Sequence, residues 1–425
     1  MATAVFFSYP VHGHIAPALG VVGDLVRRGE RVLFFATERS RAKIEATGAE
    51  FRCYRHGHDE FNPDPPTDGL FSDMARLSAL TEELVPELVE QLAGEQVDYL
   101  LIDTKSLWGR LVAQVLKLPA VTFSVVFALR PGVVAPAELV NMLYGGASQD
   151  GLLRGLEGLN RYFGNVRRMD RANRTHSPGI VEYLGNPHPM NIIFTSRAFQ
   201  IGQEAFGEEY KFVGPSIPPA RDAAMDFPYA ALAEGKPLIL VSLGTTFFRA
   251  DDFYRACFET FAEMPWQIVL ACGRGNKARL GVPPRNVFVE EFVPQMELLQ
   301  KASLFLTHGG MNSANEGLSL GVPLLVVPQR GDQFLVGRRV AELGAGLMIH
   351  PAQATAAALQ AAAQRILSEP SFAASAGVLA QSLNEAGGYR RAAEEVLTHV
   401  ARQKGKDAQS PRLPSDFLYT VPSGA

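Results

Sequence analysis

The chain has 425 residues, carries 40 Lys and Arg against 44 Asp and Glu, and is 47% hydrophobic. A chain of this length exceeds what one hydrophobic core usually serves, which predicts two domains of roughly 200 residues each. The balanced charge offers no basic excess for nucleic acid or an anionic membrane, so we expect neither nucleic-acid binding nor stable membrane association.

Cysteine usage and the first residues predict a cytoplasmic protein. The 3 cysteines lie far apart and show neither metal-ligand nor redox spacing. Residues 1–9 lack a basic segment and lead directly into a strand pattern, so we expect no cleaved signal peptide. The sequence contains no apolar run near the ~20 residues that span a bilayer.

The first half of the chain alternates short apolar runs with amphipathic stretches. Strands are predicted at residues 5–8, 31–36 and 97–102, and helices at 17–28 and 107–116. This alternation is typical of parallel strands joined by crossover helices. We therefore expect a doubly wound α/β domain.

Two histidines follow the first predicted strand, and an aspartate follows the third. Ligands bind at the carboxyl edge of open α/β sheets, which is where His12, His14 and Asp103 are expected. A neutral imidazole offers an acceptor nitrogen near pH 7, so a histidine there suits proton abstraction. A carboxylate beside it would stabilise the imidazolium that forms. Plainer roles stay open, because His14 could cap its turn and Asp103 could cap the next helix.

The second half of the chain repeats this rhythm after a break. Residues 214–235 begin Gly-Pro-Ser-Ile-Pro-Pro-Ala and continue charged and alanine-rich, which predicts an interdomain linker. Strands are predicted at 238–241, 267–271 and 287–289, and a helical pattern runs from 354 to 403. A second doubly wound domain is the expected result.

A strand-to-helix turn in this second half combines several groups that suit a diphosphate. The apolar run 303–307 predicts a buried strand, and the two glycines after His308 lead into a helix at 311–320. Such a turn presents free backbone N–H groups and the positive end of a helix dipole to an anion. The side chains of His308, Asn312 and Ser313 would add hydrogen-bond donors.

Polar groups beyond this turn suit the rest of a nucleotide sugar. Glu316 lies near the same end of the helix, where a carboxylate can accept hydrogen bonds from two ribose hydroxyls. Another predicted strand, 323–327, ends near Asp332 and Gln333, which could bind sugar hydroxyls in the same way. The stretch therefore predicts a nucleotide-sugar site.

Ordered motifs across this stretch carry a family resemblance. The sequence reads Phe-Val-Pro-Gln at 292–295, His-Gly-Gly-Met-Asn-Ser at 308–313 and Asp-Gln at 332–333. It resembles the donor signature of family 1 glycosyltransferases, which move a sugar from a nucleotide diphosphate to a small lipophilic acceptor. Residues 9–17, Tyr-Pro-Val-His-Gly-His-Ile-Ala-Pro, resemble the Gly-His-Ile-x-Pro motif of the same family. The chain is most similar to the bacterial macrolide and flavonoid branch.

The resemblance covers nearly the whole chain and implies an α/β GT-B fold, in which two doubly wound Rossmann-like domains face each other across a cleft. It implies an acceptor-binding domain at 1–218, a nucleotide-sugar domain at 219–385 and a helix at 386–404 that packs back on the first domain. The Pro, Ser and charged content of residues 405–425 predicts a mobile tail.

The resemblance also implies an inverting transfer with His14 as the general base and Asp103 as its partner. The partners would be a UDP-hexose, with glucose the expected hexose, and a small-molecule acceptor such as a macrolide or a polyphenol. No cofactor is implied besides the UDP-sugar co-substrate. The chain has no Asp-x-Asp pair, so we expect no metal and assign the leaving-group charge to backbone N–H groups, His308 and the helix dipole.

The predicted donor site draws on several segments. Phe292 stands where many relatives have a tryptophan that stacks on uracil, and the turn at 242–246 resembles the family's second phosphate-facing turn. The predicted donor-binding residues are Ser242, Gly244, Thr245, Phe292, Val293, Gln295, His308, Gly310, Met311, Asn312, Ser313, Glu316, Asp332 and Gln333.

Apolar residues of the first domain predict a lipophilic acceptor pocket. The candidates are Phe61, Phe71, Phe123, Phe127 and Met142, although the same residues suit a core equally well. Other functions of the same fold stay open: a dTDP-deoxysugar donor, a lipid acceptor, an epimerase, or a non-catalytic nucleotide-sugar binding homologue. A nicotinamide-dependent oxidoreductase is disfavoured, because the first strand-to-helix turn lacks Gly-x-Gly-x-x-Gly.

Overall fold

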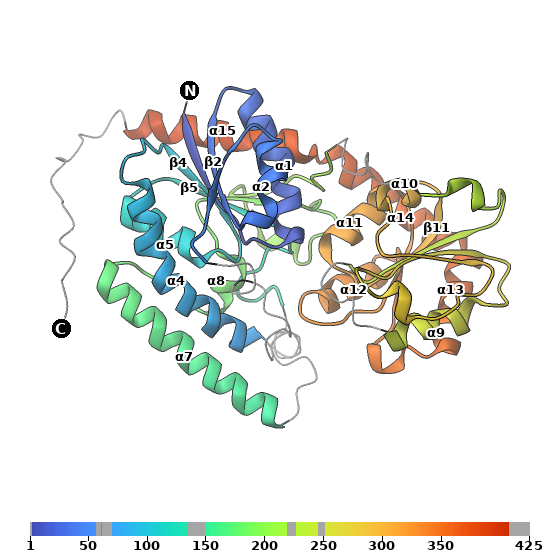
Figure 1. Cartoon of the computed structure of the whole chain (residues 1–425). Coiled ribbons are helices and arrows are strands. Elements are labelled where there is room, and N and C mark those ends of the chain that lie inside the picture. The colour runs from blue at the N-terminus through green and yellow to red at the C-terminus, as the bar shows by residue number, and fades with distance from the viewer. Residues whose placement is uncertain are drawn as a thin grey trace.

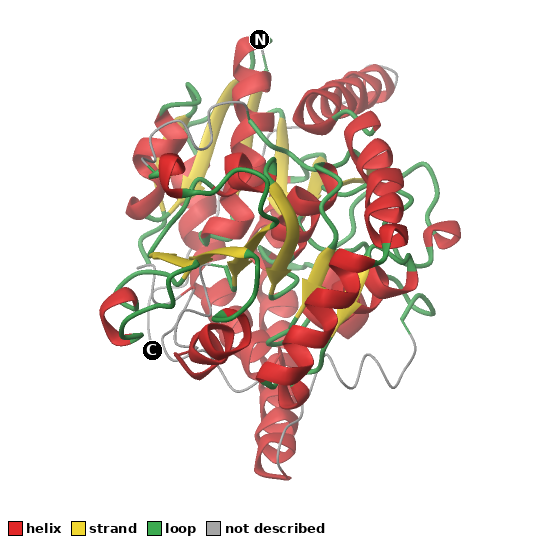
Figure 2. Cartoon of the chain, turned by 90° about the vertical axis from the view of Figure 1, so that its right-hand side faces the viewer, coloured by secondary structure: helices red, strands yellow, loops and turns green. Residues whose placement is uncertain are grey.

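The computed structural model describes residues 2–56, 61, 70–134, 149–218, 227–244 and 251–407. These residues form two lobes, each built on one sheet with helices around it (Figure 1; Figure 2). The strand pairs described in both sheets are parallel. The prediction of two doubly wound α/β domains is confirmed.

The first lobe holds a seven-stranded sheet. Its strands are β1 (Thr3–Phe7), β2 (Arg31–Ala36), β3 (Glu50–Cys53), β4 (Tyr99–Asp103), β5 (Ala120–Ser124), β6 (Met190–Ile193) and β7 (Tyr210–Phe212), arranged in the order β3-β2-β1-β4-β5-β6-β7. Its α-helices are α1 (His12–Arg27), α2 (Arg41–Glu45), α4 (Leu70–Leu92), α5 (Leu107–Leu116), α7 (Gln149–Asn173) and α8 (Ile180–Gly185).

The second lobe holds a six-stranded sheet. Its strands are β8 (Leu238–Ser242), β9 (Gln267–Ala271), β10 (Val287–Glu290), β11 (Ala302–Thr307), β12 (Leu324–Val326) and β13 (Gly346–Met348), in the order β10-β9-β8-β11-β12-β13. Its α-helices are α9 (Asp251–Phe261), α10 (Gln295–Leu299), α11 (Met311–Ser319), α12 (Gln333–Glu342), α13 (Ala356–Ser368) and α14 (Pro370–Glu385), and α15 (Gly388–Asp407) ends the described chain. Short 3₁₀ turns lie at Glu38–Ser40, Gln203–Ala205, Tyr229–Ala231, Lys277–Arg279 and Pro351–Gln353.

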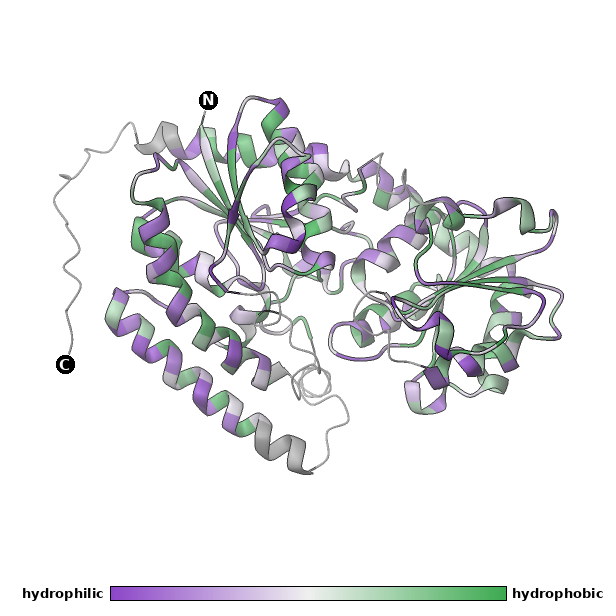
Figure 3. Ribbon diagram, viewed as in Figure 1, coloured by the Kyte–Doolittle hydropathy of each residue, from purple (hydrophilic) through white to green (hydrophobic). Residues whose placement is uncertain are grey.

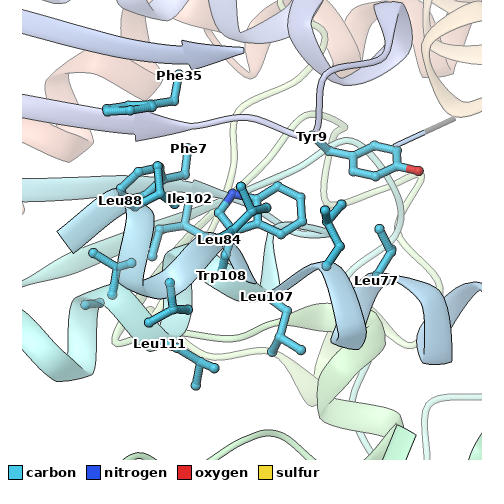
Figure 4. Packing of buried hydrophobic residues seen from close by; sticks show 14 of the residues in the cluster. Phe7, Tyr9, Phe35, Leu77, Leu84, Leu88, Ile102, Leu107, Trp108 and Leu111 are labelled. Atoms are coloured by element: carbon cyan, nitrogen blue, oxygen red, sulfur yellow. The ribbon is translucent and has the colours of Figure 1, made fainter. Parts of the chain in front are cut away.

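The strands form because their residues are apolar on both faces, as a parallel sheet between two helix layers requires. In β1, Val5 and Phe7 belong to the core beneath α4 and α5, whereas Ala4 and Phe6 belong to the core beneath α1 and α15. Figure 3 shows the strands of both lobes in hydrophobic green. Figure 4 shows the first of these cores, packed around Trp108.

Each sheet has one point where the strand order reverses. β1 pairs with β2 on one side and with β4 on the other, and β8 pairs in the same way with β9 and β11. The chain thus builds one half of each sheet outward and then returns to the centre to build the other half. Ligands of doubly wound sheets bind at the carboxyl ends of the two strands at such a point.

Helix α1 begins one turn earlier than the sequence predicted. It starts at His12, so Pro17 lies inside the helix rather than in its first turn. Val11 precedes it in extended conformation, and the His14 amide already bonds to the Val11 carbonyl at 3.0 Å. Inside the helix, Pro17 removes the N–H that would reach the Gly13 carbonyl. His14 therefore lies on a helix and not on a loop.

The C-terminal helical stretch is divided into three helices. Pro370 takes the first turn of α14, and Gly387, with φ of 95°, lies between α14 and Gly388, the first residue of α15. Helix α15 then packs on the first lobe, where Ala392 and Val396 are buried in the core that α1 covers. Figure 1 shows α15 lying beside α1.

Candidate active site

The carboxyl ends of β1 and β4 bring His14 and Asp103 together. The Nδ1 atom of His14 lies 2.8 Å from Asp103 Oδ2 and 2.9 Å from Oδ1. Asp103 is 1% exposed, whereas the His14 side chain keeps 11% of its surface exposed. A neutral imidazole that donates its Nδ1–H to this carboxylate keeps a lone pair on Nε2. The pair has the arrangement of a base with an orienting carboxylate.

Asp103 does not serve as the cap of the helix that follows it. The N-cap position of α5 is Ser106, and no side chain bonds to the first turn there. Asp103 Oδ1 instead accepts the Lys105 amide at 2.8 Å and lies 2.9 Å from His14 Nδ1. Two donors hold the carboxylate in place, which favours the orienting role over the capping role.

Two further residues beside His14 were not predicted from the sequence. The Tyr9 ring meets the His14 ring edge to face, with centroids 5.1 Å apart, and Lys105 Nζ lies 5.1 Å from the Tyr9 centroid. Figure 4 shows Tyr9 at the margin of the core, with its hydroxyl directed away from the labelled aliphatic side chains. Lys105 lies two residues after Asp103, so its position next to the predicted strand end could have marked it as a candidate site residue. The position of Tyr9 depends on the tertiary fold.

An ion pair on α4 extends this cluster. Arg76 Nη2 lies 2.5 Å from Asp73 Oδ1 and donates to the Phe61 carbonyl at 3.0 Å. The Tyr9 hydroxyl donates to the same carbonyl at 2.6 Å. Burial raises the pKa of Tyr9, so the phenol stays protonated and remains a donor. Polar groups thus surround Tyr9, the neighbour of His14, and the apolar acceptor pocket stays a prediction.

In the second lobe, the carboxyl ends of β8 and β11 hold His308 between two glycines. A Cβ atom on Gly244 would lie 2.6 Å from His308 Cε1, and one on Gly310 would lie 2.5 Å from His308 Nε2. Gly244 also has φ of 77°, which other residues rarely adopt. Burial lowers the pKa of His308 to about 4, against an opposing hydrogen bond with the Ser242 backbone. The imidazole is therefore neutral near pH 7.

Helix α11 begins directly after these glycines with an uncapped first turn. Gly310 is the N-cap residue, and no side chain bonds to the amides that follow. The first-turn N–H groups and the helix dipole therefore remain available to an anion, with Asn312 and Ser313 beside them. Asn312 Nδ2 donates to the Gly13 carbonyl of α1 at 2.7 Å. This bond places the donor helix directly against the turn that carries His14.

Glu316 lies one turn further along α11 and is 2% exposed. Gln295 Nε2 donates to Glu316 Oε2 at 2.6 Å, which anchors the carboxylate. Phe292 is 45% exposed and leaves its ring accessible, whereas Val293 and Met311 are buried in the core of this lobe. Phe292 is thus the exposed member of this set, and donor contact of Glu316, Val293 and Met311 stays a prediction.

Asp332 and Gln333 lie at the start of α12. Gln333 Oε1 accepts the amides of Gln329 and Arg330 at 2.8 and 3.2 Å, so this side chain also shapes the loop before the helix. Burial raises the pKa of Asp332, and the ammonium of Lys105 is the strongest opposing influence. Since Lys105 belongs to the first lobe, Asp332 faces the side where the candidate base lies.

Four of the predicted acceptor residues are buried in apolar cores. The most exposed of them, Phe71, is 4% exposed. Phe61 and Phe71 belong to the core around Trp108. Phe123 belongs to the core beneath α1, and Phe127 belongs to a core that both lobes share. Contact of these residues with an acceptor stays a prediction.

Met142 and Thr245 lie outside the described residues. In the part of the chain that the structure describes, no three His, Cys, Asp or Glu side chains are grouped so that they could hold a metal ion. The helices of that part include none that is both long and apolar enough to cross a membrane.

Comparison with known proteins decides the family. A family model described as the C-terminal domain of erythromycin biosynthesis protein CIII-like proteins matches residues 255–396. YojK of Bacillus subtilis (strain 168), named a UDP-glucosyltransferase, is 32% identical over 416 residues, which cover 96% of this chain and 100% of that protein. The chain belongs to the family 1 glycosyltransferases.

Two other proteins are also similar to this glycosyltransferase. Demethyllactenocin mycarosyltransferase of Streptomyces fradiae is 28% identical, over 93% of this chain and 86% of that protein. The crystal structure of the calicheamicin glycosyltransferase CalG4 matches with a TM-score of 0.77 and 27% identity, over 95% of this chain and 99% of that one. The GT-B fold is confirmed, and the chain is an enzyme that uses a nucleotide sugar as its co-substrate.

Proposed function

We propose that this glycosyltransferase moves a hexose, with glucose as the first choice, from a UDP-sugar to a hydroxyl group of a small lipophilic acceptor such as a macrolide or a polyphenol. The observation that carries the proposal is the bond between Asn312 and Gly13, which sets the amino end of α11 beside His14 and its partner Asp103. An acceptor activated at His14 and a diphosphate bound at α11 would meet at this junction. Residues 1–218 would bind the acceptor, and residues 219–385 the donor.

Each side chain would have a separate part in the reaction. Asp103 accepts the Nδ1–H of His14, so the Nε2 atom takes the proton of the acceptor hydroxyl while its oxygen bonds to the anomeric carbon. The bond from that carbon to the β-phosphate oxygen breaks, and its electron pair leaves with UDP. This single in-line displacement inverts the anomeric centre. The first-turn N–H groups of α11 and the His308 ring meet the leaving charge.

The choice of donor and acceptor rests on three side chains and on the names of two relatives. The exposed Phe292 ring can stack on uracil, and the anchored Glu316 carboxylate can bind ribose hydroxyls. A relative named a UDP-glucosyltransferase supports UDP and glucose, whereas a relative named a mycarosyltransferase makes a different sugar the alternative. The Lys105 ammonium lies over the Tyr9 ring, which contacts His14, and it favours a phenolic acceptor because it would stabilise a developing phenolate there.

Mass spectrometry of products from a panel of UDP-hexoses and dTDP-deoxysugars, each offered to flavonoid, macrolide and sterol acceptors, tests the proposal. We expect one added hexose from UDP-glucose on a phenolic or macrolide acceptor, with inverted configuration. His14→Ala should lower the rate by ~10²–10⁴-fold and leave UDP affinity unchanged. His12→Ala, at an exposed position in the same turn, is the matched control. Retained configuration, or full activity of His14→Ala, would contradict the mechanism.

A further inference from the structure

One carbonyl in the first turns of α1 lacks its helical donor. In an α-helix the N–H of each residue bonds to the carbonyl four positions earlier, so the Gly13 carbonyl would be bonded by residue 17. That residue is Pro17, which has no N–H. Asn312 Nδ2 from the second lobe supplies the missing donor at 2.7 Å. The Gly13 carbonyl, one residue before His14, therefore receives this hydrogen bond from the second lobe.

A second bond of the same kind lies one turn further along α11. Asn315 follows Asn312 by three positions, so both side chains lie on one face of the helix. Asn315 Nδ2 donates to the Phe194 carbonyl at 2.7 Å, and its Oδ1 accepts the Thr195 hydroxyl at 2.9 Å. Asn315, Phe194 and Thr195 are 1%, 2% and 0% exposed. The two partners follow β6 at the carboxyl edge of the first sheet, the edge where His14 lies.

These contacts fix direction as well as distance. An apolar contact between two lobes tolerates sliding, whereas a buried amide with both ends bonded has no water to replace a lost partner. The angle between α11 and the first sheet is therefore set by the hydrogen bonds of Asn312 and Asn315. A shift of about 1 Å at a reacting centre can lower a rate on the order of 10²-fold, so this angle matters for transfer.

We propose that Asn312 and Asn315 are positioning residues, which hold the donor helix in register with the turn that carries His14, and that Pro17 creates the free carbonyl on which this register depends. The inference rests on the proposed roles of His14 and of α11. It gives Asn312 a part besides any contact with the diphosphate. Asn315 is not among the predicted donor-binding residues, so positioning is the one role assigned to it.

Kinetics of variants at the Asn315 junction test the proposal away from the diphosphate. Thr195→Val removes the hydroxyl with little change of shape, and we expect kcat to fall on the order of 10-fold with an unchanged Kd for UDP. Asn315→Leu should act in the same direction, and adding Thr195→Val to it should bring no further loss. Thr195→Ser keeps the hydroxyl and should keep kcat. Ser319→Ala, which removes a buried hydroxyl bonded to Glu316 within α11, is the matched control.

Hydrogen exchange of the UDP-bound enzyme tests the Asn312 junction. Peptides that cover residues 9–17 should exchange faster in Asn312→Ala, because the Gly13 carbonyl loses its donor. Adding Pro17→Ala supplies an N–H to that carbonyl, so it should restore protection in α1 without restoring kcat. A merely local stabilisation of the helix would let the second substitution restore both.

Any one of four results would overturn the proposal. The first is a normal kcat in both Thr195→Val and Asn315→Leu. The second is recovery of kcat when Pro17→Ala is added to Asn312→Ala. The third is a loss of UDP affinity in Thr195→Val as large as its loss of kcat. If no donor and acceptor pair gives transfer, the proposed function fails, and the exchange of residues 9–17 still decides the junction: unchanged exchange in Asn312→Ala rejects it.

Discussion

Replacing Asp103 by asparagine keeps the size of the side chain and removes one acceptor oxygen. In the native site, Oδ1 accepts the Lys105 amide at 2.8 Å, and both oxygens lie within 2.9 Å of His14 Nδ1. Because the Lys105 amide is fixed by the backbone, it should retain the one oxygen of asparagine. The new NH₂ group then faces His14 Nδ1, which can accept it only if the imidazole proton moves to Nε2. That tautomer has no lone pair for the acceptor hydroxyl.

We expect Asp103→Asn to lower kcat on the order of 10²–10⁴-fold, the range for loss of a correctly oriented general base. The Kd for UDP should not change, because the donor site lies in the second lobe. Release of UDP at saturating substrates gives kcat, and calorimetric titration gives the Kd. The control is Asp98→Asn at the other end of β4, where the carboxylate accepts the Thr3 amide at 2.7 Å. An unchanged kcat in Asp103→Asn would show that Asp103 only stabilises its turn.

Three further predictions concern the donor, metal ions and pH. Glu316→Ala should weaken UDP and UDP-sugar alike, on the order of 1–3 kcal/mol, whereas Asp332→Ala and Gln333→Ala should weaken only UDP-sugar; equal losses for both ligands would misplace the sugar subsite. EDTA should leave the rate unchanged, and a complete, metal-reversible loss would refute this. Burial, then Arg110, lowers the pKa of His188 from 6.5 to about 4, so the unfolded chain binds the extra proton and stability falls as pH drops from 6.5 toward 4. Between pH 7 and pH 5, the free energy of unfolding of His188→Gln should fall by about 2 kcal/mol less than that of the wild type, as denaturant titrations would measure. Equal losses in both proteins would contradict the assignment.

The fold followed from the sequence because its strands are buried on both faces. The strands at 31–36 and 267–271 and the helix at 107–116 have the predicted bounds in the structure. Parallel strands between two helix layers must be apolar throughout, so their signal needs no knowledge of tertiary partners. The donor segment could be predicted for a related reason: strand, turn and helix are contiguous from 302 to 319, and this one local unit supplies six of the fourteen predicted donor-binding residues.

Groups that meet only through tertiary packing could not be predicted. Pro17 favours a helix start at its own position, yet the helix starts at His12, and the Gly13 carbonyl accepts a hydrogen bond from Asn312, 299 positions away. Tyr9 and Arg76 are ordinary in their local sequence, and only the fold brings them to one carbonyl beside the candidate base. The predicted acceptor residues show the same limit, because a phenylalanine in a core and a phenylalanine in a binding pocket produce the same sequence pattern.

In the proposed donor site, the turn and helix at 308–320 would meet a diphosphate with dipoles rather than with cationic side chains. Residues 308–320 contain no Lys or Arg, and burial lowers the pKa of His308 to about 4, so its ring is neutral near pH 7. A cationic clamp would hold substrate and product UDP almost equally, which raises affinity without raising kcat. Oriented N–H groups at α11 gain most where the bridging oxygen takes up charge in the transition state. Because Asn312 bonds that same helix to the first turn of α1, the proposed charge stabilisation and the position of the proposed base would both depend on α11.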